Sequence, residues 1–265
     1  MKFSIIVVCL NPGEKLFETI ETIQSQTYKN YEVVVKDGMS TDGSVDKLLP
    51  DERIRVFKEK DKSIYDAMNQ AVKYATGDYY FFLNCGDLFY SDTVLEEVAG
   101  FIEEKKKQGE KCDIVYGNTY EQKTGTVVTS TPKINGFSCY RNVPCHQTCF
   151  YASRMFEKRA YMPEYKVRAD YEHFLWCYYE AKAEIISMPV TVSYYEGGGF
   201  SETKENRKRS SKEHKEITGK YMSVAERLKY KTILLITLAP LRRKVAESKR
   251  LSGVYNKIKS FLYRR

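Results

Sequence analysis

The 265-residue chain lacks the features that mark several large classes of protein. No apolar run approaches the ~18–20 residues of a membrane-spanning helix, so we expect no integral multi-span protein. The seven cysteines form no Cys-x-x-Cys pair, and there are only three histidines. Cys145 and Cys149 flank His146, but half-buried strand residues explain this cluster better than a zinc site does. Free thiols of this kind indicate a reducing cytosol.

Two common phosphate-binding loops are also missing. Neither a P-loop nor a Gly-x-Gly-x-x-Gly segment follows the first apolar stretch, residues 3–9. That stretch runs into Asn11-Pro12-Gly13 without a small-residue cleavage site. We therefore interpret it as a buried strand rather than a signal peptide, and secretion is not expected.

The positive charge is concentrated near the C-terminus. Residues 1–200 hold 24 Lys and Arg against 29 Asp and Glu, a net of −5, whereas residues 201–265 hold 19 against 6, a net of +13. A ten-residue apolar patch, 232–241, lies between cations and is suited to a membrane interface. We expect residues 201–265 to form a basic helical extension that docks on an anionic membrane surface. Packing on the body and contact within a homo-oligomer remain open, and nucleic-acid binding is not expected because no zinc-finger or helix-turn-helix pattern occurs.

Strand and helix signals alternate along the first half of the chain. Strands are expected at 3–9, 31–35, 53–57 and 78–83, and helices near 16–23, from Ser44, and from Ser63 to a C′ glycine at Gly77. This βαβα order predicts an α/β fold with a mostly parallel sheet and right-handed crossovers. The second half is less regular, with a hairpin near 123–125, strands at 148–151 and 185–192, and a helix at 169–181.

Polar residues follow the predicted strand ends. They are Asn11, Asp37, residues 59–61 and residues 84–87. Ligands of open α/β sheets bind beyond the carboxyl ends of the strands. These groups should therefore line one rim of the sheet and form its ligand site.

The segments on this rim resemble those of the family 2 glycosyltransferases of the GT-A fold. The order is Asn11, then 37–44, then 59–71, then 75–87, and the most specific mark is Ile64-Tyr65-Asp66-Ala67-Met68-Asn69. The subgroup that it is most similar to builds bacterial surface polysaccharides. The resemblance is strong over residues 1–90, extends to about residue 200 and is absent from the tail. It implies a GT-A catalytic domain over 1–200, with a nucleotide-sugar half at about 1–90 and an acceptor half at about 91–200.

The resemblance also assigns roles to individual residues. Asn11 and Asp37 would hold the base and ribose of a nucleotide-sugar, and Asp66 would be the nucleotide-side carboxylate, with Asp61 near the same pocket. Asn69, Asn84 and His146 complete the residues expected to contact the donor. Residues 196–201 resemble the family's mobile glycine loop, although a loop between domains would have the same composition.

A metal site is implied at residues 84–87. Asn84-Cys85-Gly86-Asp87 stands where the family has an Asp-x-Asp motif, but Asn84 replaces the leading aspartate. A divalent cation, Mn²⁺ or Mg²⁺, bound by hard oxygen ligands would neutralise the charge on a departing diphosphate. Asp87 would then be its carboxylate ligand.

The resemblance places the acceptor-side base on a later helix. An inverting transferase needs a carboxylate to take the proton of the attacking hydroxyl, and we assign Asp170 to this role. Glu172 is the fallback, but residues two apart on a helix face different ways, so both cannot face the sugar.

Structural explanations compete for several of these residues taken singly. Asp66 has capping-box spacing from Ser63, Asp37 and Asp42 precede glycines as turn residues do, and Asp170 could complement a helix dipole. His146 could be a structural histidine. Turn chemistry, however, does not predict that all of these groups gather on one rim.

The sequence as a whole predicts a metal-dependent, inverting glycosyltransferase. It would move a sugar from a nucleotide-sugar, with UDP as the expected carrier, to a glycan or lipid-linked acceptor at the cytoplasmic face of the membrane. Asn84 keeps open an alternative, a catalytically silent domain that binds nucleotide or glycan as an assembly partner. A nucleotidylyltransferase is disfavoured because residues 10–15 are a poor version of its glycine-rich basic loop.

Overall fold

The strands of this protein form one mixed sheet. A computed structural model describes residues 1–195, 203–237, 253, 255, 257 and 258. Within these residues nine strands pair in the order β3-β2-β1-β4-β8-β6-β9-β5, with β7 on the free part of β6. Their bounds are β1 Phe3–Cys9, β2 Tyr31–Asp37, β3 Ile54–Lys58, β4 Tyr79–Phe82, β5 Leu88–Phe89, β6 Ile114–Glu121, β7 Thr126–Val128, β8 Cys149–Ala152 and β9 Ile185–Tyr195.

The first four strands make the parallel half of the sheet. β3, β2, β1 and β4 are mutually parallel, as the βαβα sequence pattern predicts. β8 then enters antiparallel between β4 and β6, β9 returns parallel to β6, and β5 pairs antiparallel with β9. The predicted α/β fold is confirmed, and its irregular second half corresponds to the mixed part of the sheet.

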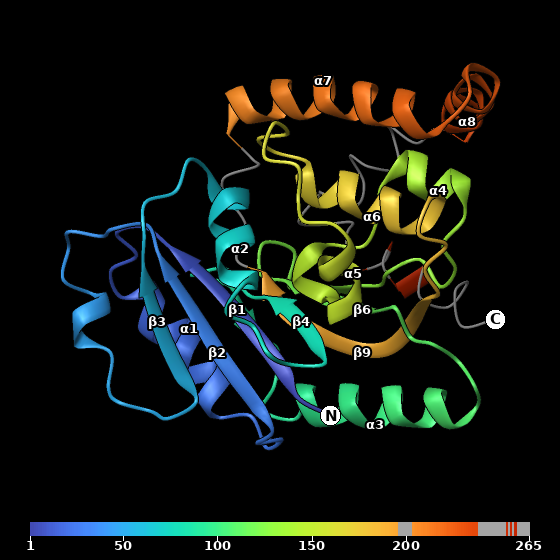
Figure 1. Cartoon of the computed structure of the whole chain (residues 1–265). Coiled ribbons are helices and arrows are strands. Elements are labelled where there is room, and N and C mark those ends of the chain that lie inside the picture. The colour runs from blue at the N-terminus through green and yellow to red at the C-terminus, as the bar shows by residue number, and fades with distance from the viewer. Residues whose placement is uncertain (196–202, 238–252, 254, 256, 259–265) are drawn as a thin grey trace.

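Helices cover both faces of this sheet, so β1 is buried along its whole length and is apolar apart from Ser4. α1 (Lys15–Gln24) and α3 (Val94–Lys107) cover one face, and Phe3, Ile5 and Val7 point into that core. α2 (Ile64–Val72), α5 (Ser153–Lys158) and α6 (Ala169–Tyr179) cover the other face, where Ile6 and Val8 are buried. Figure 1 shows these helices on either side of the strands, with the short α4 (Gly136–Arg141) beside α6.

The basic extension begins as a further layer on the second face. α7 (Lys204–Tyr221) lies across α6, and α8 (Val224–Ile236) lies beside α4 (Figure 1). Ile217 and Met222 belong to the same buried cluster as α2 and α6. The Tyr230 ring of α8 packs on Phe137 and Tyr140, with ring centroids 5.8 and 5.6 Å apart. The first two helices of the extension therefore pack on the body.

One expected boundary is wrong. α2 ends at Val72 with Lys73 as its C-cap, so Gly77 is not the C′ residue of that helix. Gly77 is instead pressed against β1, where a Cβ would lie 2.7 Å from the Ser4 nitrogen. The residue is glycine because two backbone segments approach closely there, and not because the helix ends in a left-handed turn.

Candidate active site

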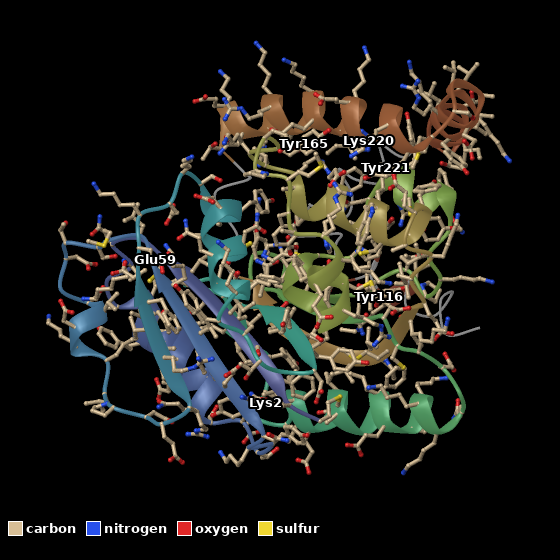
Figure 2. All side chains as sticks on the ribbon, in the orientation of Figure 1. Lys2, Glu59, Tyr116, Tyr165, Lys220 and Tyr221 are labelled. Carbon is tan, nitrogen blue, oxygen red and sulfur yellow. The ribbon has the colours of Figure 1, made fainter. Side chains whose placement is uncertain are left out.

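The parallel strands bring the predicted rim residues to one edge. β1 and β2 are in register through Cys9 and Asp37, and β1 and β4 through Ile6 and Phe82. Asn11, Asp37 and Asn84 therefore leave the sheet on the same side. α2 begins at this edge, where the strands end (Figure 1). Figure 2 shows Glu59 at this edge and Lys2 at the opposite one.

Asp37 is a buried carboxylate with one oxygen to spare. Its Oδ1 accepts hydrogen bonds from the backbone nitrogen and hydroxyl of Ser40, at 3.0 and 2.5 Å. Its Oδ2 is buried with no hydrogen-bond partner among the described residues. Asn11 lies alongside, donating its backbone N–H to the Ser40 hydroxyl and accepting from the Thr41 backbone N–H, each at 2.8 Å. A buried oxygen of this kind is a ready acceptor for a ligand donor.

Asp61 is linked to the Asp37 backbone by a lysine that binds both residues. The fully buried Lys36 ammonium donates to Asp61 Oδ2 at 3.1 Å, to the Glu59 carbonyl at 2.6 Å and to the Asp37 carbonyl at 3.3 Å. A Cβ on Gly38 would lie 2.8 Å from the same Asp61 oxygen. Asp61 thus neutralises the buried Lys36 ammonium beside Asp37.

The side chains of two residues in the α2 motif already have hydrogen-bond partners within the protein. Asp66 accepts from the Lys62 N–H at 2.8 Å, while its own N–H donates to the Ser63 hydroxyl at 3.3 Å, which is the capping arrangement. Asn69 pairs in both directions with the backbone of Tyr161, at 2.8 and 2.9 Å. The Asn69 amide therefore ties α2 to the segment before α6, and both of its polar atoms are engaged there.

A line of polar groups joins four elements at the centre of the rim. The Asn84 Nδ2 lies 3.0 Å from His146 Nε2, and His146 Nδ1 lies 3.4 Å from Asp170 Oδ2. Asp170 Oδ1 accepts from the Tyr65 hydroxyl at 2.8 Å. These residues come from the end of β4, the short 3-10 helix His146–Thr148, α6 and α2. Sequence positions 65, 84, 146 and 170 are therefore one continuous site.

The electrostatics of this line hold Asp170 in its charged form. Burial raises the pKa of Asp170, but hydrogen bonds from His146 and Tyr65 and the charge of His146 outweigh it, so the net pKa lies below its usual value. Burial lowers the pKa of His146, but its hydrogen bond to Asp170 and the charges of Asp170 and Asp87 prevail and raise it. Asp170 is therefore a carboxylate at neutral pH.

Asp87 is a second acid on the rim and is half-buried. Its Oδ2 accepts from Gln147 Nε2 at 2.8 Å, and its backbone N–H closes a tight turn onto the Asn84 carbonyl at 2.8 Å. Gly86 has φ +95°, a conformation suited to glycine. Burial raises the pKa of Asp87, against lowering contributions from His146, Gln147 and Lys15. A half-buried carboxylate in this setting is suited to a hard cation.

The fallback base Glu172 is wrong. It is fully buried on the opposite side of α6, where Arg159 donates to both of its oxygens at 2.7 and 2.6 Å. Lys220 and Tyr221 of α7 also donate to it, at 2.7 and 2.5 Å. The expectation that only one of the two acids faces the rim is confirmed, and it is Asp170.

Sequence reasoning named no role for two residues of the site, Tyr65 and Gln147. Tyr65 lies within the motif 64–69 that carries the family resemblance, and Gln147 directly follows His146. The signal that could have identified them is residue type, because a hydroxyl and an amide at motif positions are able to hydrogen-bond to the acids nearby. The glycine loop at 196–201 lies outside the described residues.

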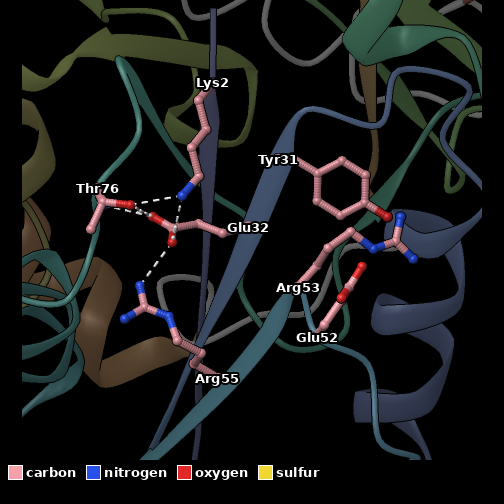
Figure 3. Close-up of a pocket in the computed structure, with 7 residues that line it drawn as sticks. All are labelled: Lys2, Tyr31, Glu32, Glu52, Arg53, Arg55 and Thr76. Carbon is pink, nitrogen blue, oxygen red and sulfur yellow. Dashed lines mark hydrogen bonds and ion pairs between the residues drawn. The ribbon is translucent and has the colours of Figure 1, made fainter.

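A pocket of about 460 Å³ lies at the opposite edge of the sheet, where the strands begin (Figure 3). Glu32 is at its centre and pairs with Lys2 at 3.1 Å and with Arg55 at 2.8 Å. Thr76 donates to the same carboxylate from its backbone N–H and its hydroxyl. These charges satisfy one another, and the rim acids Asp37, Asp87 and Asp170 are not among the lining residues.

A sequence profile described as glycosyl transferase family 2 matches residues 4–164, more than half of the chain. The chain belongs to glycosyl transferase family 2. The PGL/p-HBAD biosynthesis glycosyltransferase of Mycobacterium bovis is 35% identical over 208 residues, which cover 76% of this chain and 79% of that protein. The E. coli enzyme named UDP-Glc:alpha-D-GlcNAc-diphosphoundecaprenol beta-1,3-glucosyltransferase WfaP is 34% identical over 151 residues, 54% of this chain and 57% of its own.

The fold agrees with solved structures. S. aureus TarS 1-349, in complex with UDP-GlcNAc, superposes with a TM-score of 0.61 at 20% identity. The match covers 79% of this glycosyltransferase and 64% of that TarS fragment, so this chain spans less than two thirds of it. The GT-A fold and the enzyme class, both expected from the sequence, are confirmed.

Proposed function

We propose that this enzyme transfers a sugar from a UDP-sugar to a lipid-linked glycan acceptor with inversion, and that Asp170 is the base. The observation that carries the proposal is the placement of Asp170 between His146 and Tyr65, in line with Asn84 on the donor rim. The printed name of WfaP, with its UDP-Glc donor and diphosphoundecaprenol acceptor, supports the choice of substrates. So does the UDP-GlcNAc complex of TarS.

The proposed chemistry is a single displacement. The acceptor hydroxyl attacks the anomeric carbon as the glycosyl–oxygen bond to the diphosphate breaks, and Asp170 takes the hydroxyl proton. The pKa of Asp170 lies below its usual value, so the side chain is ready to accept a proton at neutral pH. Tyr65 and His146 hold its two oxygens from opposite sides, which fixes the direction in which the proton is received.

The donor is proposed to bind along the rim from Asp37 to Asp87. The unpartnered Asp37 Oδ2 is suited to accept a hydrogen bond from the nucleoside, and Asn11, Asp61 and Asp66 frame the same edge. Asn84 Oδ1, also buried without a partner among the described residues, is a second acceptor toward the sugar.

Asp87 is the residue that would hold a divalent cation. Its half-buried carboxylate supplies the hard oxygen that Mn²⁺ or Mg²⁺ prefers, so the side chain fits the group. Among the described residues no three His, Cys, Asp or Glu side chains gather as a ready-made metal site. Diphosphate oxygens and water would complete the shell. Such a cation would neutralise charge on the leaving diphosphate.

We also propose that the extension docks the enzyme on an anionic membrane face. No helix in the part of the chain that the structure describes has the length and apolar character needed to cross a bilayer. α8 nevertheless exposes Val224, Leu228, Leu235 and Ile236, each more than 60% accessible. The outer face of α7 adds exposed cations, namely Lys204, Lys208, Arg209, Lys212 and Lys215. Apolar side chains flanked by cations bind anionic lipid interfaces.

Transfer assays on a panel of donors test the proposed function. Purified protein is incubated with UDP-, GDP- and dTDP-glucose and UDP-GlcNAc, with and without Mn²⁺, and both thermal shift and released nucleotide are measured. We expect a UDP-sugar to raise the melting temperature and to be consumed faster with Mn²⁺. Consumption of GDP- or dTDP-sugars alone would contradict the proposed donor. Stabilisation without any turnover would favour the catalytically silent alternative.

A further inference from the structure

We infer that Glu213, on α7 of the basic extension, is a positioning residue that fixes Asp170 for catalysis. This inference rests on the proposed role of Asp170 as the base. It gives α7 a task in the transfer reaction that is separate from any contact with a membrane.

The Glu213 carboxylate binds the backbone immediately before the catalytic helix. Its Oε1 accepts from the Lys166 N–H at 2.9 Å, and its Oε2 accepts from the N–H groups of Val167 and Arg168 at 3.0 and 2.9 Å. The side chain is 7% exposed, so water does not compete strongly for these bonds. Three charge-assisted bonds onto consecutive residues fix the path of the chain that leads to Asp170.

α6 has no cap of its own that could replace Glu213. The N-cap residue Arg168 makes no capping hydrogen bond with its side chain. The guanidinium instead turns to α7, donating to the carbonyl and hydroxyl of Ser210 at 3.0 and 2.7 Å. The free N–H groups at a helix start need an acceptor, and an anion there also complements the helix dipole. In this fold the N-cap N–H of Arg168, and the two N–H groups that precede it, find their acceptor on a helix more than forty residues away in sequence.

The same short segment is also held from the catalytic side. The Tyr65 hydroxyl lies 2.9 Å from the Val167 carbonyl oxygen and 2.8 Å from Asp170 Oδ1. Val167 thus donates its N–H to α7, and its carbonyl lies beside the Tyr65 hydroxyl of α2, whose single proton is shared between this carbonyl and Asp170. The position of Asp170 against Tyr65 and His146 depends on both attachments.

α7 is held in place by several contacts with the body of the protein, so it can fix the position of the segment before α6. His214 Nε2 lies 2.7 Å from the Tyr140 carbonyl oxygen, and its ring stacks on Tyr171 at 5.4 Å. Ile217 is fully buried, and Lys220 and Tyr221 bind the buried Glu172 at the far side of α6. Figure 2 shows Tyr165, Lys220 and Tyr221 between α7 and the body. Loss of this support would let Asp170 shift, and a shift of about 1 Å at a reacting centre lowers the rate on the order of a hundredfold.

The test compares Glu213→Gln with Glu205→Gln in the full-length enzyme. Glu205 is an exposed acid in the first turn of the same helix, so the control removes the same charge away from α6. The Glu213→Gln side chain would keep one acceptor but would present an N–H₂ group to backbone N–H donors. We expect kcat to fall at least tenfold in Glu213→Gln with the donor KM within twofold of wild type. Glu205→Gln should match wild type, and Glu213→Asp should recover part of kcat because it restores a carboxylate.

The outcomes separate this inference from the proposed function. If Asp170→Asn abolishes transfer while Glu213→Gln keeps a wild-type kcat, the positioning role is overturned and the base assignment stands. If Asp170→Asn is fully active, the base assignment itself fails. A raised donor KM together with a lowered melting temperature, at an unchanged kcat, would show a purely structural role and overturn the inference. Should Glu213→Gln not fold, a folded Glu213→Asp with wild-type kcat would overturn it, and one with reduced kcat and unchanged donor KM would support it.

Discussion

Two carboxylates on α6, only two positions apart, have opposite surroundings. Asp170 lies on the rim between an imidazole and a phenol, whereas Glu172 is enclosed by Arg159, Lys220 and Tyr221. Burial raises the pKa of Glu172, but its hydrogen bonds with these three partners outweigh it and lower the net value. The first acid is available to a substrate, and the second holds the layers of the protein together.

This contrast predicts that Glu172→Gln damages stability rather than chemistry. Removing one charge from a buried, paired cluster leaves Arg159 and Lys220 uncompensated, and we expect a loss of about 3–5 kcal/mol in the free energy of unfolding. Urea denaturation would measure it, with Glu180→Gln, at the exposed C-cap of the same helix, as the control. A Glu172→Gln protein as stable as wild type would contradict this assignment.

The titration of the His146 imidazole can be used to probe the site directly. The chain has three histidines, and burial lowers the pKa of His173 to about 4 and that of His214 below its usual value. His146 alone has a raised pKa, chiefly because Asp170 outweighs its burial. NMR titration should show one histidine with a pKa above the usual 6.5 in wild type, and this resonance should titrate at lower pH in Asp170→Asn.

The sign of the matching stability effect follows from the raised pKa. The His146–Asp170 pair contributes fully to the free energy of unfolding when the pH lies below the unfolded histidine pKa of about 6.5. This contribution is lost as the pH rises through the pKa of His146 in the folded protein. The stability difference between wild type and Asp170→Asn should therefore be larger at pH 6 than at pH 8.5. Equal differences at both pH values would contradict the pairing.

At the scale of elements, one edge of the sheet contains a close backbone approach at Gly77. A Cβ on Gly77 would lie 2.7 Å from the Ser4 nitrogen, whereas nothing lies within 4 Å of a Cβ built on Gly100 in α3. Gly77→Ala should therefore destabilise the protein by about 1–3 kcal/mol, and Gly100→Ala should be neutral or stabilising because it favours the helix. Thermal unfolding of the two variants would show whether they differ in this direction.

Two deletions of different length should separate the roles of the two helices of the extension. Deleting residues 223–265 removes α8 with its exposed apolar side chains, and we expect loss of binding to phosphatidylglycerol vesicles while transfer to a soluble acceptor is kept. Deleting from 203 also removes α7, with buried Ile217 and the bonds of Glu213, and should give an unstable, inactive protein. Continued co-sedimentation of the shorter deletion with vesicles would assign membrane docking to another surface.

Across the whole molecule, the sequence predicted what depends on periodicity and local motifs. The apolar strand at 3–9, the βαβα order and the polar residues after the strand ends predicted that these polar residues share one edge of the sheet. Parallel register then brings Asn11, Asp37 and Asn84 together without further information. The family resemblance added Asp170, which periodicity alone could not place near residue 84.

What the sequence could not predict are contacts between distant segments. Gly77 has the position of a helix-ending residue, and only the packing of two backbones shows why it is glycine. Asn69 lies inside the most specific motif, yet its amide pairs with Tyr161, ninety-two residues away. In the sequence Glu213 is one charge in a basic helix, and only the fold places it at the start of α6.

The central claim is that the carboxylate of Asp170 receives the acceptor proton. The most direct measurement is kcat for sugar transfer from a UDP-sugar by Asp170→Asn, in protein shown by circular dichroism to be folded and by thermal shift to bind donor. The amide keeps the shape of the side chain but removes its basicity, so kcat should fall by about 10²–10⁴-fold while donor binding persists. A kcat equal to that of wild type would show that another group is the base.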